Sequence, residues 1–275
     1  MKNLIMLPNL GIIAGRGSLP YLIAGNYTKQ GGNCYIAAIK DEADIDQIKD
    51  FEYKILKIGM VGEAIKYFKE HEVKNIIFIG GVNRPNFKNL AVDTIGGLLL
   101  FKIVGQKIRG DDSLLKTVAD FFESYGFKVI SSNEIYKNQQ GNSNIITDTN
   151  PISSDKNDIE LGIKLLNHLS SFDIAQSVIV ESGYILGIEA AEGTDNLITR
   201  CAALRKNPHG GVLVKIAKLG QDNRLDMPTI GPNTIKNLAK YNYKGVAIQK
   251  NNVIIVEEEL TIKLANEHKI FITKC

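Results

Sequence analysis

Short apolar runs alternate with amphipathic stretches over the first 130 residues of the chain. The runs GIIAG (11–15), CYIAAI (34–39) and NIIFIGG (75–81) are bounded by glycine or polar residues, which is typical of buried strands. In residues 111–126 apolar side chains recur every three or four positions, after two aspartates and before a closing glycine, so this pattern predicts a helix. Alternating strands and helices predict a Rossmann-like, mostly parallel sheet in an N-terminal α/β domain (1–130).

The pattern changes at about residue 131. Residues 131–158 are dominated by Ser, Asn, Gln, Thr and Asp, so this stretch buries little and is interpreted as a polar linker whose few isoleucines could still dock. Later apolar runs predict a hairpin turning at Gly183 and a second, catalytic α/β domain at 159–275. Its strands are expected at 177–182, 184–190, 211–217, 244–249, 252–257 and 270–273, and its helices at 194–204 and 232–242.

Composition narrows the class of protein. The 275 residues exceed what one core usually organises, which agrees with two domains. The 33 basic and 30 acidic residues give a net charge of +3, too small to indicate nucleic acid as a partner. The three cysteines form no CxxC pair, which favours a reducing compartment and a cytoplasmic protein. No apolar run approaches the roughly 18 residues of a membrane span.

Two glycine-containing turns follow predicted strands of the first domain. Gly15 and Gly17 precede a helix that is expected to start near Ser18, which is how α/β folds present backbone N–H groups to a phosphate. A dinucleotide fingerprint would need glycine at position 20, where the chain has Pro20, and the lysine of a P-loop is also missing. A phosphate-binding turn and an ordinary tight turn both fit.

The second glycine turn, residues 80–87, carries Asn83 and Arg84. Both side chains follow a predicted strand and suit a phosphate or a sugar, although a plain surface loop also fits.

Acidic residues stand at two expected helix starts. Asp111 and Asp112 open the predicted helix of residues 111–126, where they either cap it or face a crevice and hold a metal-bound water. Gly193, Thr194 and Asp195 lie at a strand-to-helix junction, with Thr194 as the expected N-cap. Each group is explained by helix capping as well as by ligand binding.

The segment KLGQDNRLDMPTIGP (218–232) concentrates charge beside a predicted strand. Asp222 and Asp226 offer the carboxylate oxygens that Mg²⁺ prefers. Lys215, Lys218 and Arg224 supply the opposite charge, which suits phosphate oxygens. The four histidines fall in separate segments without metal-ligand spacing, so zinc chemistry is disfavoured.

Six blocks occur in the order seen in a known family: GIIAGRGSLP, GGVNRPNF, GDDSLLKTVADFFESYGFKV, DIAQSVIVESGYILGIEAAEGTDNLITRCA, GVLVKIAK and QDNRLDMPTIGPNTI. In these blocks the chain resembles the UDP-2,3-diacylglucosamine diphosphatases of the lipid A pathway, in their single-chain, two-domain form rather than the metallophosphoesterase type. The resemblance implies Mg²⁺-assisted attack of water on the uridine-side phosphorus of UDP-2,3-diacylglucosamine. The implied products are UMP and 2,3-diacylglucosamine 1-phosphate.

The resemblance also assigns expected roles. Asp226, directly before the block MPTIG, inherits the catalytic and metal-binding role. Asp222 is expected as a second catalytic residue and metal ligand by a weaker carry-over, and Arg224 as the third catalytic residue. The expected substrate-binding residues are Gly15, Gly17, Ser18, Asn83, Arg84, Asp111, Asp112, Gly193, Thr194, Asp195, Lys215, Lys218, Gln221 and Thr229. Arg16 and Asn83 depart from the residues that are common in the family. These differences affect the expected contacts with the ligand more than the expected reaction.

The expected partner is the amphiphilic nucleotide sugar, and its acyl chains suggest peripheral contact with the cytoplasmic face of the inner membrane. A homodimer is a further expectation, and nucleic acid is not an expected partner. Two alternatives stay open. One is an NAD-dependent oxidoreductase that uses the N-terminal glycine turn, and the other is a nucleotide-sugar-binding protein without catalysis on the same fold.

Overall fold

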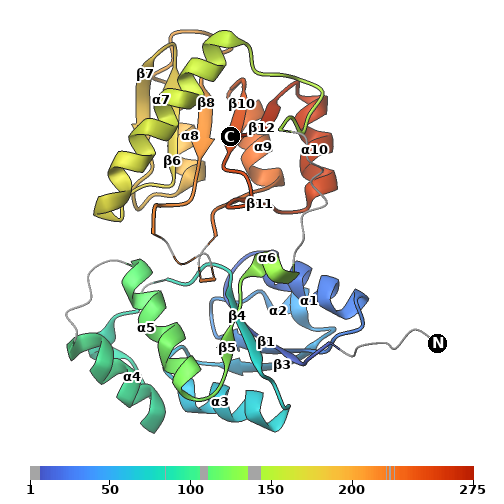
Figure 1. Cartoon of the computed structure of the whole chain (residues 1–275), viewed down its shortest axis with the longest axis vertical. Coiled ribbons are helices and arrows are strands. Elements are labelled where there is room, and N and C mark those ends of the chain that lie inside the picture. Colours follow the sequence, from blue (N-terminus) through green and yellow to red (C-terminus); the bar gives the residue numbers. More distant parts are fainter. Residues whose placement is uncertain are drawn as a thin grey trace. The chain divides into compact units, whose positions relative to one another are not determined.

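The computed structural model describes residues 7–83, 85–105, 111–135, 144–220, 222, 224–225 and 227–275 (Figure 1). Contacts between Cα atoms divide them into two compact units. The N-terminal unit contains residues 7–135 together with Arg224 and Leu225, and the C-terminal unit contains the others. Each unit is an α/β structure built around its own sheet, so the predicted fold class is confirmed.

The N-terminal unit is built on a five-stranded sheet in the order β3-β2-β1-β4-β5. All neighbouring strands are parallel, as the alternating pattern predicts. The strands are β1 (Leu10–Ala14), β2 (Cys34–Ile39), β3 (Glu52–Leu56), β4 (Asn75–Ile79) and β5 (Lys128–Val129). The helices are α1 (Leu19–Lys29), α2 (Ile45–Ile48), α3 (Val61–Glu70), α4 (Thr94–Gly105), α5 (Asp111–Ser124) and α6 (Ser132–Ile135), with a 3-10 turn η1 at Phe87–Asn89.

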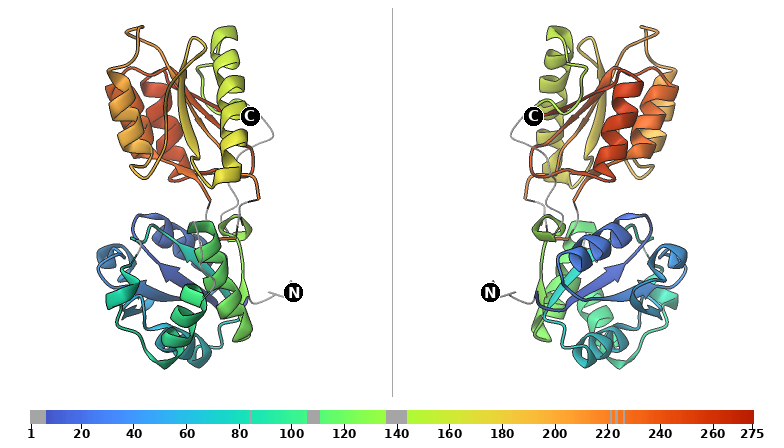
Figure 2. Two further views of the ribbon diagram at one scale, coloured as in Figure 1. Left: turned by 90° about the vertical axis from the view of Figure 1, so that its left-hand side faces the viewer. Right: turned by 90° about the vertical axis from the view of Figure 1, so that its right-hand side faces the viewer.

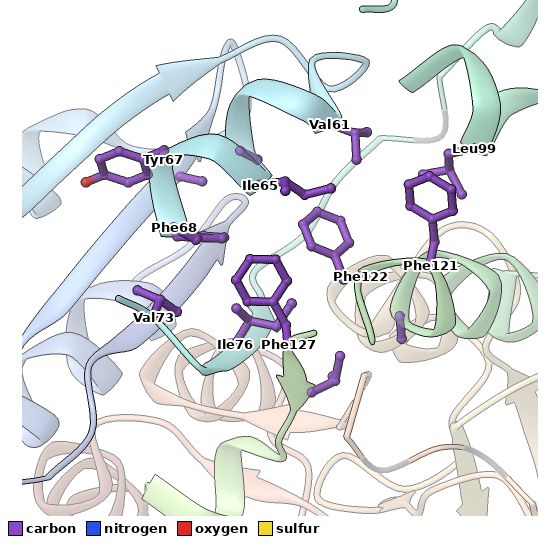
Figure 3. Packing of buried hydrophobic residues seen from close by; sticks show 14 of the residues in the cluster. Val61, Ile65, Tyr67, Phe68, Val73, Ile76, Leu99, Phe121, Phe122 and Phe127 are labelled. Atoms are coloured by element: carbon purple, nitrogen blue, oxygen red, sulfur yellow. The ribbon is translucent and has the colours of Figure 1, made fainter. Parts of the chain in front are cut away.

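An aromatic core fills the space between the N-terminal sheet and helices α3 and α5 (Figure 3). The rings of Phe68 and Phe127 lie 6.0 Å apart edge to face, and those of Phe78 and Phe122 lie 5.5 Å apart in the same arrangement. Offset and edge-to-face pairs of this kind stabilise a core beyond the area that they bury. Leu225, from the segment that follows β8, belongs to this core.

The C-terminal unit has a mixed sheet in the order β12-β10-β8-β6-β7. Strands β8, β10 and β12 are parallel, whereas β6 and β7 are antiparallel to their neighbours. Helix α7 covers one face and α8, α9 and α10 the other (Figure 2). The strands are β6 (Ser177–Glu181), β7 (Tyr184–Ile188), β8 (Val212–Lys215), β10 (Gly245–Ile248) and β12 (Phe271–Lys274), with β9 (Thr229–Ile230) and β11 (Ile254–Ile255) pairing separately. The helices are α7 (Ser153–Leu169), α8 (Thr194–Ala202), α9 (Pro232–Lys240) and α10 (Glu258–Glu267), with a 3-10 turn η2 at Ser170–Phe172.

The expected hairpin turns at Ser182 and Gly183, whose φ angles are 52° and 81°. Two consecutive residues with positive φ are the signature of a tight turn between antiparallel strands. Both turn N–H groups donate to the carboxylate of Asp158 in α7, at 2.8 and 2.7 Å. Asp158 is buried and satisfied, so it fixes the hairpin against the helix.

The described parts of the stretch 131–158 contain more regular structure than a polar linker would. It contains α6, a bridge between Ile145 and Thr273, and the first six residues of α7. The interpretation of the whole stretch as linker is therefore wrong for these parts. The reason lies in its acids: Asp155 accepts the N–H of Ile152 at 3.1 Å and the ammonium of Lys244 at 2.6 Å, so a residue that looked solvated is buried.

No helix in the described ranges is both long and apolar enough to cross a membrane.

Candidate functional site

The turns after β1 and β4 meet at the carboxyl edge of the N-terminal sheet. The N–H of Gly15 donates to the carbonyl of Ile79 at 2.8 Å, and Arg16 pairs with Gly81 in an antiparallel bridge. Strand order reverses between β1 and β4, and ligands of open α/β sheets bind at such a switch point. Gly17, with φ of 96°, then leads into α1.

Glycine is required where these two turns approach each other. A Cβ atom on Gly15 would collide with the backbone of Gly80 and Gly81, and one on Gly80, whose φ is 92°, would meet the backbone of Gly15 and Arg16. Ser18 precedes α1 without a side-chain cap, and Pro20 occupies its first turn, where a missing N–H costs little. The two glycines therefore have a packing role whether or not a ligand binds.

Glu42, which follows β2, joins the same edge. Its Oε1 accepts the N–H of Asn83 at 3.1 Å. Its Oε2 lies 2.8 Å from Nη1 of Arg16, as an ion pair without hydrogen-bond geometry. The carboxylate thus connects both glycine turns, and its side chain is only 12% exposed. Gly15, Gly17, Ser18 and Asn83 are brought together here, whereas Arg84 lies outside the described residues.

The two aspartates before the predicted long helix are where the pattern placed them. Helix α5 begins at Asp111, so Asp111 and Asp112 lie in its first turn. Their side chains are not among the described parts, and their expected contact with substrate stays a prediction.

A chain of three polar side chains lies at the carboxyl edge of β8 in the C-terminal unit. Lys215, the last residue of β8, donates from Nζ to Oγ1 of Thr194 at 2.6 Å. Thr194 in turn donates to Oε1 of Glu189 at 2.8 Å. The register pairs Ser177 with Lys215, and Ser177 Oγ lies 3.5 Å from Thr194 Oγ1. A buried cation is thereby fixed beside the first turn of α8.

Glu189 has one oxygen that the chain of hydrogen bonds does not use. Its Oε2 is buried and accepts no hydrogen bond from the described residues. A buried polar atom without a partner is costly and is often found where a functional group or water binds.

The start of α8 differs from the prediction in one detail. Its N-cap is Gly193, with φ of 80°, and Thr194 is the first helical residue, because the Thr194 hydroxyl is turned to Glu189 instead of capping the helix. Asp195 lies in the first turn and accepts from Nδ2 of Asn237 at 2.9 Å, which links α8 to α9.

Two further charged groups lie at opposite edges of the C-terminal sheet, at β12 and at β7. Lys274 is buried, and its pKa lies below its usual range because of desolvation and the nearby charge of Lys250. On the other side of the sheet, Arg200 pairs with Glu192 at 2.7 Å and lowers the pKa of that carboxyl.

The charged segment 218–232 is divided between the two units. Lys218 forms an ion pair with Asp173 at 2.5 Å within the C-terminal unit. Arg224 belongs to the N-terminal unit and pairs with Glu123 of α5 at 3.0 Å. Both expected phosphate ligands are therefore already balanced by a carboxylate.

The other expected residues of this segment are placed unevenly. Thr229 opens the short strand β9 and is half-buried, and Asp222 is half-buried in the loop before it. Gln221 and Asp226 lie outside the described residues.

The metal ligands expected from the sequence are carboxylates, whose oxygen atoms suit a hard cation. Among the described residues, no group of three or more His, Cys, Asp and Glu side chains is arranged to hold a metal ion. The expected ligands, Asp222 and Asp226, would be two carboxylates, and Mg²⁺ commonly uses one or two together with water and phosphate oxygens. Because Asp226 lies outside the described residues, Mg²⁺ at this pair stays a prediction.

Two family models match almost the whole chain. One is described as the LpxI N-terminal domain and covers residues 9–139, and the other as the LpxI C-terminal domain and covers residues 142–273. The chain belongs to the LpxI family. The resemblance inferred from the six sequence blocks is thereby confirmed.

A curated LpxI relative has a name that states its substrate and its activity. The protein of Caulobacter vibrioides named UDP-2,3-diacylglucosamine pyrophosphatase LpxI is 29% identical over 269 residues. The match covers 96% of this chain and 96% of the relative.

Sequence reasoning missed four acidic residues of this LpxI chain. Glu42, Glu123, Asp173 and Glu189 each contact a residue that the sequence singled out. Their partners lie far along the chain in three of the four cases, so no local spacing could pair them. Glu42 carries a usable signal, since an acid after the second strand of a Rossmann-like sheet faces the ligand edge.

Proposed function

We propose that the chain hydrolyses the diphosphate of UDP-2,3-diacylglucosamine to UMP and 2,3-diacylglucosamine 1-phosphate, a step of lipid A biosynthesis. The observation that carries the proposal is the match of both LpxI domain models, supported by a Caulobacter relative that is named for this substrate and aligns over 96% of both chains. In this reaction water attacks the phosphorus on the uridine side.

The C-terminal unit supplies a fixed positive charge for such a substrate. Lys215 is held by Thr194, and an ammonium group in this position suits phosphate oxygens. Its burial strengthens the attraction, since water screens the charge poorly there. Thr194 and Glu189 keep the ammonium in one orientation, so it needs little reorganisation when the phosphate arrives.

The N-terminal unit supplies backbone rather than charge. Gly17 leaves room for a close approach by a phosphate or ribose, Gly15 lets the two turns meet beside it, and α1 begins directly behind them. Asn83 adds a side-chain amide at the same edge. These groups support binding and orientation of the nucleotide sugar.

Asp226 is proposed to orient the attacking water and to accept its proton. Asp226 and Asp222 would also hold Mg²⁺, which when bound neutralises phosphate charge and lowers the pKa of a bound water. Lys218 and Arg224 are proposed to exchange their carboxylate partners for phosphate oxygens, because both ion pairs are partly open to solvent.

Hydrolysis in H₂¹⁸O tests the proposal. We expect UMP release, with ¹⁸O in UMP and none in the sugar phosphate. Asp226→Ala is expected to lower kcat by roughly 1,000-fold or more, because it removes the residue that orients water. The matched control is Asp148→Ala, an exposed acid of the C-terminal unit that is expected to stay within about twofold of the parent.

Three outcomes contradict the proposal. UMP does not form from the intact substrate, ¹⁸O enters only the sugar phosphate, or Asp226→Ala hydrolyses as fast as Asp148→Ala. Removal of divalent cations with a chelator, followed by addition of Mg²⁺, tests the metal separately. Activity that survives the chelator would exclude the assigned role of Asp222 and Asp226 as metal ligands.

A further inference from the structure

Helix α4 (Thr94–Gly105) is anchored to the N-terminal core by its inner side. Leu99 is buried and lies beside Phe121 of α5 (Figure 3). Ile95 and Ile103 pack against the same core, and Gly96 lets the helix approach the backbone of Gly59. The orientation of α4 in this unit is therefore fixed by its contacts.

The outer side of α4 is also apolar. Leu98, Phe101 and Val104 are 57%, 81% and 63% exposed. Residues three apart share one face of a helix, so the three side chains form a stripe, called here the α4 stripe.

The neighbouring helix α3 shows what an ordinary solvent-facing side looks like in the same unit. Its exposed residues are all charged: Glu63, Lys66, Lys69 and Glu70. The α4 stripe is thus a property of this helix rather than of the surface around it.

Within α4 itself the charge has one sign. Lys102 is exposed between Phe101 and Val104, and residues 94–105 contain no acid. Asp93, just before the helix, is engaged as a cap: its Oδ1 accepts the N–H of Gly96 at 2.6 Å and its Oδ2 that of Glu63 at 3.0 Å.

The size of the α4 stripe favours a bilayer surface over a membrane span or a second copy of the chain as its partner. Twelve residues make a helix of about 18 Å, too short to cross a hydrocarbon core of about 30 Å. Its outer side offers roughly 200 Å², well below the roughly 800 Å² per partner of a stable dimer. An apolar helix face with one exposed lysine and no acid suits the surface of an anionic bilayer, which needs no matching groove.

We propose that the α4 stripe inserts into the interfacial region of a bilayer that contains anionic phospholipid. Leu98, Phe101 and Val104 enter the boundary between headgroups and acyl chains, and Lys102 lies among the phosphates. The interaction does not depend on the hydrolase activity proposed above, since lipid vesicles without nucleotide sugar are sufficient to observe it.

Vesicle flotation tests the proposal with the full chain. We expect the protein to float with vesicles of phosphatidylcholine and phosphatidylglycerol, and to bind less to phosphatidylcholine alone. Phe101→Asp is expected to lower the bound fraction by at least about tenfold, because it places a carboxylate in the inserted face. The matched control is Phe172→Asp in η2, where an equally bulky side chain is 71% exposed in the other unit, and it is expected to bind like the parent.

Charge is tested in the same experiment. Lys102→Glu is expected to weaken binding to the anionic vesicles and to leave binding to phosphatidylcholine unchanged, and added salt should mimic this effect. Circular dichroism checks that each variant is folded, and UMP release in detergent is measured in parallel so that loss of activity and loss of lipid binding are separated.

Three results would overturn the proposal. The parent protein stays with the soluble fraction when anionic vesicles float, or Phe101→Asp binds vesicles as well as the parent does. In the third, neither the parent nor Phe101→Asp binds vesicles, and light scattering shows that the parent is a dimer and Phe101→Asp a monomer. This result would assign the stripe to contact with a second copy of the chain.

Discussion

Cys34, at the start of β2, shows how burial changes the chemistry of one side chain. Its thiol is buried and donates a long contact of 3.7 Å to the carbonyl of Ala24. Desolvation raises the pKa of Cys34 from 9.0 to about 12. The neutral thiol is therefore the form that the folded protein keeps over most of the alkaline range.

This shift predicts a pH dependence of stability. A group whose pKa is higher in the folded state stabilises the fold fully below its unfolded pKa, and that stability is lost as the pH rises toward the folded pKa. For Cys34 the loss runs from about pH 9 to about pH 12 and is on the order of 3 kcal/mol. Urea unfolding at several pH values should show a shallower alkaline decline for Cys34→Ala than for the parent. Parallel curves for the two proteins would contradict the assignment.

Acidic residues show the limit of prediction at this scale. Asp155 and Asp158 have the polarity of linker residues in the sequence, yet both are buried, because each finds a complete set of donors. The donors Lys244, Ser182 and Gly183 are far along the chain, so their proximity depends on the tertiary fold. Candidate residues such as Lys215 could be proposed from type and position, but their partners could not.

At the scale of elements, glycine in the turns after β1 and β4 allows these two turns to approach each other closely at the edge of the N-terminal sheet. Gly15→Ala is expected to lower the free energy of unfolding by about 1–3 kcal/mol, because its Cβ has no room against the backbone of Gly80 and Gly81. The control is Gly25→Ala inside α1, where nothing lies within 4 Å and alanine should stabilise the helix by about 0.5–1 kcal/mol.

Denaturant unfolding of both variants measures these changes. Equal stability of Gly15→Ala and the parent would show that the two turns can move apart, and the packing role of Gly15 would then be excluded.

Elements with strong patterns were predicted well. Strand β2 and helix α8 start where the pattern placed them, and the antiparallel pair β6 and β7 turns at the expected glycine. Helix α5 also begins at its two aspartates. In these segments, periodicity, turn residues and helix-end residues all indicate the same local structure, and the tertiary contacts agree with it.

Elements with conflicting patterns were not predicted. Strand β3 (EYKIL) lies at the sheet edge and mixes exposed and half-buried positions, so its apolar content is low. Helix α4 is apolar around most of its circumference and contains two glycines, which hides its period. Helix α7 begins with the polar run SSDKND, whose two aspartates are buried only because of distant partners.

At the scale of the whole molecule, the N-terminal unit is discontinuous in sequence. Its core contains Leu225, which is 9% exposed and comes from the half of the chain matched by the C-terminal domain model. Arg224, the residue before it, adds the ion pair with Glu123. The boundary between the two domain models therefore differs from the boundary between the two packed units.

Leucine truncations test this arrangement. Leu225→Ala is expected to destabilise the N-terminal unit by about 2–4 kcal/mol, because it leaves a cavity in the aromatic core. Leu219→Ala, in the same loop but 63% exposed, should change stability by less than about 0.5 kcal/mol. Hydrogen exchange read by mass spectrometry should show lost protection in α3 and α5 for Leu225→Ala alone. Unchanged protection there would exclude a contribution of this loop to the core.

The placement of Leu225 in the N-terminal core has a consequence for recombination between related genes and for the design of chimeras. A chimera that joins the first half of this chain to the second half of a 29% identical relative would place the relative's residue at the position of Leu225, inside this chain's aromatic core. Substitutions at position 225 and in α5 are thus expected to be inherited as a matched pair. We therefore expect the two halves of such a gene to be exchangeable between lineages only where this residue fits the core, even though each half has a domain name of its own.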